Sequence, residues 1–375
     1  MAHLDERVPA IAAAQLSMLV GTGVLDRELE GRDVLQEGTP IYDLEGEVLF
    51  ERVRMGERTT VDLAVLPELG SPLIGVNGGE QWDPEALIEE ATAALSKRQR
   101  KAIYDEVRLV AYSFPKLAVQ FLDGGREVAL IECHTGALVP EESGDDNFKR
   151  IPFRAELPRA EARKRAREFE RVLDVSPAQL REVGLWSTVI RADLDWATLL
   201  RRRQSRDLHF SARNGDHTVC YEVRGQQTNV WCVGASVQMI LDFYRYEYTQ
   251  VRLAQELGLG TLSNPNGLPY SQDGEVVVVL ENLSSKALNA TMNATPNFNE
   301  FKSEIRANRP LVSFVPGHSR TVAGYTQTTS PILSLNFQGL LVFDPWPPNA
   351  GVITRWENFG ATTYRRTFTA RVDLA

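Results

Sequence analysis

Three residues whose side chains can perform nucleophilic chemistry occur in order in the second half of the sequence: Cys232, His318 and Asp344. A thiolate can attack a carbonyl carbon, a histidine can take and return the proton, and a carboxylate can orient the ring and stabilise the imidazolium. Each residue alone has an ordinary explanation, because buried cysteines, turn histidines and Asp-Pro turns are common. Their order and local surroundings together favour a catalytic group.

Cys232 lies at the predicted start of a helix. After Trp231, apolar residues recur at helical spacing as far as Tyr244. The free N–H groups and the positive dipole end of a helix N-terminus favour a thiolate over a thiol. Gln226, in the preceding loop, is predicted to donate to a tetrahedral oxyanion together with the backbone N–H of Cys232, and Gln227 is the competing residue.

The histidine and the aspartate are predicted at the ends of strands. Residues 310–315 and 321–325 are rich in β-branched and aromatic side chains, and the turn that joins them contains His318. The apolar run 341–343 ends at Asp344, directly before a proline. Such an end places the carboxylate at the rim of a sheet, where it can hold the ring of His318 in its productive tautomer.

The motifs around these residues resemble a known family. The segment QQTNVWCVGASVQMILDF, followed by PGHSRTVAGY and VFDPWPP, is similar to the bacterial papain-like cysteine peptidases of the bacteriocin-processing and avirulence-effector groups. The resemblance covers about residues 216–369. It implies a papain-like fold in which a helical lobe with the cysteine packs against an antiparallel sheet with the histidine and the aspartate. The site residues that it implies are Cys232 as nucleophile, His318 as base, Asp344 as orienting acid and Gln226 as oxyanion glutamine.

Two stretches depart from the family pattern. Val233, Gly234 and Ala235 stand where the family commonly has an aromatic residue and two alanines. Ser319 and Arg320 stand where it favours small apolar residues after the histidine. We expect the Arg320 side chain to face solvent, with recognition of an acidic substrate as the alternative.

The first 194 residues have a different pattern, that of an α+β module of hairpins and helices. The predicted elements are hairpins in 41–53 and 117–132, and helices in 9–25, from Pro84, in 159–173 and from Pro177. The helix predicted in 9–25 is amphipathic, too interrupted for a signal peptide and too short for a membrane span. The charges of 159–173 are expected to face solvent. An inhibitory pro-domain and a recognition module both stay open for this part.

A basic segment separates the two parts. The sequence LLRRRQSRD occupies residues 199–207, and turn-forming residues follow it. This composition predicts a junction over 195–215 between a module of residues 1–194 and a peptidase domain of residues 216–375. A linker is the plain interpretation, and a protease-sensitive processing site is the alternative.

Composition restricts the partners and the chemistry. The chain has 375 residues, of which 43% are apolar and 24% charged, as in folded globular proteins. Because 41 basic residues stand against 50 acidic ones, the net charge of -9 has the wrong sign for a nucleic-acid-binding protein. The three cysteines are Cys133, Cys220 and Cys232, an odd number without a CxxC pair, which argues against a disulfide framework and a zinc site. No metal or organic cofactor is expected, and a cytoplasmic location is the default, with export by a non-standard route left open.

These observations predict an α+β protein in which a two-lobed papain-like peptidase domain follows a hairpin-and-helix module. The expected activity is hydrolysis of a peptide or isopeptide bond in a protein or peptide substrate, through a thioester at Cys232. Two alternatives remain: a catalytically inert papain-fold interaction module, and a transglutaminase-like acyltransferase with the same triad. The first 194 residues could also inhibit the site intramolecularly, and neither nucleic acid nor a membrane span is expected.

Overall fold

A computed structural model describes most of the chain. The described residues are 4–21, 25, 38–55, 57–78, 82–99, 101–113, 116–141, 150–175, 191–196, 221–330 and 335–372. The helix predicted from Pro177 lies outside these residues, as does the predicted junction 195–215 except for its first two residues. The division of the chain at this junction therefore stays a prediction.

The first part of the chain folds into hairpins and helices, as its sequence predicts. Its helices are α1 (Arg7–Gly21), α2 (Pro84–Arg98) and α3 (Arg159–Leu173), with the short 3-10 helix η3 (Pro67–Leu69). Its strands are β1 (Thr39–Tyr42), β2 (Val48–Arg54), β3 (Thr59–Ala64), β4 (Leu73–Gly78), β5 (Glu106–Ser113), β6 (Lys116–Asp123) and β7 (Arg126–Glu132). The two predicted hairpins are confirmed as the antiparallel pairs β1/β2 and β6/β7.

The second part carries most of the remaining elements. Its helices are α6 (Cys232–Phe243), α7 (Gln250–Glu256), α8 (Glu275–Leu283) and α9 (Phe298–Arg306), with the 3-10 helices η6 (Tyr270–Gln272) and η7 (Phe359–Ala361). Its strands are β9 (Gly260–Thr261), β10 (Asn264–Pro265), β11 (Leu288–Asn293), β12 (Leu311–Val315), β13 (His318–Ser330), β14 (Leu335–Asp344), β15 (Val352–Asn358) and β16 (Arg366–Val372). The strand β8 (Arg191–Trp196) precedes this part in the chain and pairs with β13. The chain is thus an α+β protein, as predicted. None of the helices in the described ranges is both long and apolar enough to cross a membrane.

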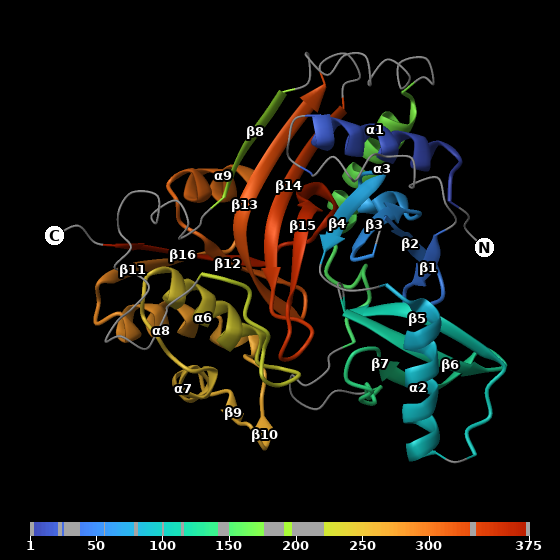
Figure 1. Cartoon of the computed structure of the whole chain (residues 1–375), viewed down its shortest axis with the longest axis horizontal. Helices are drawn as coiled ribbons and strands as arrows, with labels where there is room; N and C mark the ends of the chain where they lie inside the picture. The colour runs from blue at the N-terminus through green and yellow to red at the C-terminus, as the bar shows by residue number, and fades with distance from the viewer. Residues whose placement is uncertain are drawn as a thin grey trace.

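One sheet runs through both parts of the chain (Figure 1). Its order is β11-β16-β12-β13-β14-β15-β4-β3-β2-β1-β5-β6-β7, and β8 pairs with β13 beyond the end of β12. The two parts meet where β15 pairs antiparallel with β4, with Trp356 opposite Val76. The backbone hydrogen bonds of the sheet therefore continue from one part into the other.

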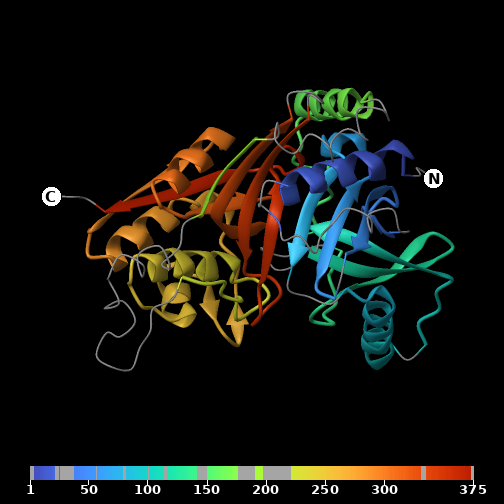
Figure 2. The ribbon, with the colours of Figure 1, turned by 45° about the horizontal axis from the view of Figure 1, so that its top comes forward.

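Helices cover both faces of the sheet in the second part. Side chains alternate along a strand, so that Val312 and Phe314 of β12 pack with residues of α6 and α8, whereas Leu311 packs with α9. Figure 2 shows α6 and α9 on opposite sides of these strands. The helix that begins at Cys232 is thereby fixed against the sheet that carries His318.

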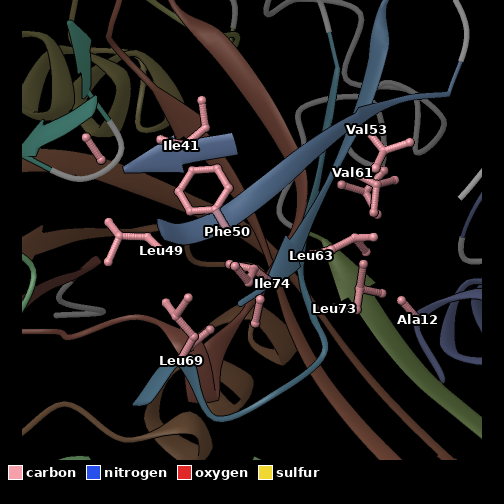
Figure 3. Close-up of a cluster of buried hydrophobic side chains, with 14 of the residues drawn as sticks. Ala12, Ile41, Leu49, Phe50, Val53, Val61, Leu63, Leu69, Leu73 and Ile74 are labelled. Carbon is pink, nitrogen blue, oxygen red and sulfur yellow. The ribbon is translucent and has the colours of Figure 1, made fainter. Parts of the chain in front are cut away.

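A shared hydrophobic core joins the two parts. Figure 3 shows a portion of it, in which Leu63 lies on the side of the strands that faces Ala12 of α1, whereas Phe50 and Ile74 lie on the other side. The same cluster includes Phe337 of β14 and Trp356 of β15, which are 1% and 5% exposed. Burial of apolar surface on both sides of the β15/β4 pairing stabilises the two parts as one unit.

Arg165 of α3 makes a polar connection between the parts. It is 8% exposed, and its guanidinium donates to the carbonyl oxygens of Ala361 and Thr362 at 3.3 and 2.9 Å. The expectation that the charges of 159–173 face solvent is therefore wrong at this residue. Arg171 of the same helix is exposed, as expected.

Arg165→Met should lower the free energy of unfolding by about 1 to 3 kcal/mol, because two buried carbonyl groups lose their donor. Arg171→Met, on the exposed face of the same helix, should change it by less than about 0.5 kcal/mol. Denaturant unfolding of both variants measures the difference. Equal stabilities of the two variants would contradict the role given to Arg165.

Candidate active site

Cys232 is the first residue of α6, as the sequence predicts. The preceding residue, Trp231, is 1% exposed and its indole N–H donates to the carbonyl oxygen of Leu259 at 2.8 Å. This hydrogen bond anchors the start of the helix. Because Cys232 begins α6, its sulfur lies at the end of the helix where backbone N–H groups are unpaired and the helix dipole is positive.

His318 is the first residue of β13 and follows a glycine turn. Gly317 has a φ of +67°, and a Cβ atom at this position would lie 2.6 Å from Cδ1 of Ile151 and 2.8 Å from Oγ of Ser113. Both of these residues belong to the first part of the chain. Glycine is required here because the backbone is left-handed and because the first part packs directly against it.

Asp344 is the last residue of β14 and holds the histidine ring. Its Oδ1 atom lies 2.6 Å from Nε2 of His318 and accepts a hydrogen bond from the backbone N–H of Trp346 at 2.8 Å. Since β13 and β14 are antiparallel, the start of one and the end of the other meet at the same edge of the sheet. His318 and Asp344 are 4% and 1% exposed, so their contact is shielded from water.

The third member of the group is Cys232, which adjoins His318. Cys232 and His318 line the same cavity. With Nε2 engaged by Asp344, the other ring nitrogen, Nδ1, is buried and has no hydrogen bond of standard geometry among the described residues. Hydrogen bonds between a catalytic base and its nucleophile are often long or poorly aligned without substrate, and they tighten when substrate is bound. The structure thus brings together three of the four predicted site residues.

The surroundings shift the protonation of all three groups. Burial alone would raise the pKa of the Cys232 thiol, but the adjacent His318 ring, and then the charge of Lys116, lower this pKa below its ordinary value. Burial would lower the pKa of His318, but the Asp344 carboxylate outweighs burial and raises it. The pKa of Asp344 itself is lowered, because the His318 and Arg320 charges outweigh its burial. These directions widen the pH range in which thiolate and imidazolium coexist.

Gln226 is held close to the site but does not line the cavity. Its side chain is buried, and its Nε2 donates to the carbonyl oxygen of Thr228 at 2.6 Å. Its backbone N–H donates to the carbonyl oxygen of Pro345, and its carbonyl oxygen accepts from the backbone N–H of Asn349, at 2.9 and 2.8 Å. The loop is thus tied to the residues that follow Asp344. Its oxyanion role stays a prediction.

Comparison with known proteins finds a family to which the second part of the chain is similar. Residues 219–371 match the Peptidase_C39 like family. The match confirms, for this part of the chain, the resemblance to papain-like cysteine peptidases. We refer to residues 219–371 as the C39-like part. No curated protein matches the sequence.

Two solved structures are each similar to 40% of this chain, about the same length as the family match. A double glycine motif protease from an AMS/PCAT transporter, in complex with the leader peptide, is 12% identical with a TM-score of 0.27, over 40% of this chain and 93% of that chain. UfSP from C. elegans is 14% identical with a TM-score of 0.25, over 40% of this chain and 32% of that chain.

The structure corrects the interpretation of Arg320. The side chain is fully buried and forms a two-point ion pair with Glu357, one contact of which is 2.9 Å. Glu357 also accepts a hydrogen bond from the Tyr364 hydroxyl at 2.6 Å. Arg320 therefore faces neither solvent nor an acidic substrate. Its charge is neutralised inside the fold and contributes to keeping Asp344 ionised.

Two residues that line the cavity were not found from the sequence. Tyr270 of η6 accepts a hydrogen bond from the backbone N–H of Gly317 at 2.9 Å and donates to Glu156 of the first part at 3.0 Å. Lys116 of β6 lines the same cavity. Neither lies in a recognisable motif, because a lysine before an apolar strand and a tyrosine in a loop have no local signal. Within the described ranges, no group of three or more histidine, cysteine or acidic residues could hold a metal ion.

The rate of Cys232 alkylation by iodoacetamide should follow a pH profile whose midpoint lies below that of an ordinary thiol, about 8.5. His318→Gln should move this midpoint upward, because it removes the contact that favours the thiolate. Peptide mapping by mass spectrometry reports the label at Cys232 separately from that at the buried Cys133, which serves as the internal control. An unchanged profile in the variant would show that the ring does not act on the sulfur.

Proposed function

We propose that the C39-like part is a cysteine peptidase that hydrolyses peptide or isopeptide bonds through a thioester on Cys232. The observation that carries the proposal is the buried ring of His318, which lies between the Asp344 carboxylate and the cavity that contains the sulfur. A base that is oriented by a carboxylate and adjoins a cysteine is the arrangement that acyl transfer requires. The family match supports the same activity.

The reaction proceeds in two halves. The Cys232 thiolate attacks the carbonyl carbon of the scissile amide, and the resulting tetrahedral adduct collapses as the His318 imidazolium gives its proton to the leaving amine. The thioester that remains is attacked by water, from which His318 takes a proton, and the carboxylic acid product leaves the regenerated cysteine. Asp344 holds Nε2 of the ring throughout and stabilises the imidazolium.

The oxyanion of each tetrahedral adduct requires donors beside the sulfur. We assign this role to the backbone N–H of Cys232 and to the side-chain amide of Gln226. Support for Gln226 comes from its burial in the loop that leads into α6 and from the fixed backbone of that loop. An amide nitrogen carries two hydrogens, and the hydrogen bond to Thr228 uses one of them.

The first part of the chain acts as a permanent portion of the enzyme in this proposal. A removable pro-domain would expose the edge of β15 and the side chains of Phe337 and Trp356 when it left. Exposed strand edges and apolar surfaces of this kind promote aggregation. The continuous sheet and shared core therefore support a retained module over an excised inhibitor.

Cys232→Ala should lower peptidase activity by about 10⁴-fold or more, because the nucleophile is lost. The assay is cleavage of a mixed synthetic peptide library by the full chain, read by mass spectrometry as new termini. Cys133→Ser is the control, and we expect it to retain activity because Cys133 packs in the hydrophobic core of the first part. Equal activity of the wild type and Cys232→Ala would refute the proposal.

The same assay separates the alternatives. In water enriched in ¹⁸O, hydrolysis places the heavy isotope in the new carboxyl terminus, whereas an acyltransferase supplied with putrescine joins the acyl group to that amine. A wild-type protein that neither cleaves the library nor transfers acyl groups to putrescine, and whose Cys232 resists alkylation, would be an inert papain-fold module.

Gln226→Ala should reduce kcat/KM by about 10²-fold, the typical loss when one oxyanion donor is removed. Gln227→Ala is the matched control. The backbone N–H of Gln227 donates to Oε1 of Gln250 at 2.8 Å, and an alanine at this position retains that N–H group. Equal kcat/KM values for the two variants would remove Gln226 from the proposed mechanism.

A further inference from the structure

Lys116 brings a buried positive charge from the first part of the chain into the candidate active site. The residue begins β6, is 7% exposed, and lines the cavity together with Cys232 and His318. Its ammonium group lies 4.8 Å from the ring centroid of Trp346, whose backbone N–H binds Asp344. The charge is therefore fixed beside the reacting groups by stacking on an aromatic face.

This ammonium group has no ion-pair partner among the described residues. A buried charge is costly unless an opposite charge or hydrogen bonds compensate it, and the cation–π contact with Trp346 supplies only part of that compensation. The carboxylates near the cavity are engaged elsewhere, since Asp344 holds His318 and Glu156 pairs with Arg365 at 3.1 Å. Within this cavity, the group that can still become an anion beside Lys116 is the thiol of Cys232.

The charges within the site also favour a position of Lys116 beside the thiolate of Cys232. When the thiol gives its proton to the ring, the four groups carry two positive and two negative charges: Lys116, His318, Cys232 and Asp344. The transfer leaves the net charge unchanged, but it creates a thiolate, and Lys116 is the cation besides the imidazolium among the described residues that line this cavity. Tyr270, which also faces the cavity, is a neutral phenol bound to Gly317 and Glu156, and its pKa is raised above its ordinary value by burial.

We propose that Lys116 completes the reactive centre as a cationic neighbour that stabilises the thiolate of Cys232, so that the first part of the chain supplies a group on which the chemistry of the second depends. The inference rests on the proposed function. The charge of Lys116 contributes to lowering the pKa of both Cys232 and His318. It thus favours the thiolate and disfavours the imidazolium, and the Asp344 carboxylate outweighs the second effect.

The test is the pH profile of Cys232 alkylation in the full chain. Lys116→Met keeps the length and apolar stem of the side chain but removes the charge, and it should move the midpoint upward by about one pH unit, equal to about tenfold slower alkylation below the midpoint. Lys116→Arg retains a positive charge and should leave the midpoint near that of the wild type. Lys97→Met, at an exposed lysine of α2, is the control and should leave it unchanged.

A Lys116→Met profile that coincides with the wild type would overturn the inference, and so would a Lys116→Arg midpoint displaced as far as that of the neutral variant. If Lys116→Met does not fold, as judged by circular dichroism, Lys116→Gln is the second neutral variant, with the same expected shift. Failure of the proposed function has a different signature. In that case the wild-type protein cleaves no peptide, while the alkylation midpoints of Cys232 still depend on the charge at position 116.

Discussion

The hydrogen-bonded contact between His318 and Asp344, 2.6 Å long and almost fully buried, is the constraint around which the candidate site is organised. It fixes which ring nitrogen remains for the sulfur, and it offsets the effect of burial on the imidazole. The contact requires that the start of β13 and the end of β14 lie at the same sheet edge, which their antiparallel pairing provides. It also requires an ionised carboxylate, which the buried Arg320 helps to maintain.

The second constraint is the junction between the two parts of the chain. The β15/β4 pairing, the shared core at Trp356 and the hydrogen bonds of Arg165 hold the first part against the turn that contains Gly317. The residue after that glycine is the histidine of the site. Packing between the parts and the position of the His318 ring are therefore linked through a single left-handed residue, Gly317. Lys116 of the first part lines the same cavity as this ring.

The sequence predicted those features that depend on local signals. Apolar periodicity located the helix that begins at Cys232, and the β-rich runs around a glycine turn and before an Asp-Pro located His318 and Asp344. The burial of Arg320 could not be predicted, because its partner Glu357 lies on another strand and their meeting depends on sheet register. Lys116 was not found for a similar reason: the chain has many basic residues, and only the continuous sheet determines which of them reaches the cavity.

The central claim is that the sulfur, the ring and the carboxylate act as one proton-sharing group. ¹⁵N chemical shifts of the His318 imidazole, followed from about pH 5 to about pH 9 in the wild type and in Cys232→Ala, measure the protonation of the ring directly. The account predicts a doubly protonated ring near neutral pH in the wild type and a lower pKa once the sulfur is removed. A ring that is neutral near pH 7 in both proteins, with the same titration, would contradict it.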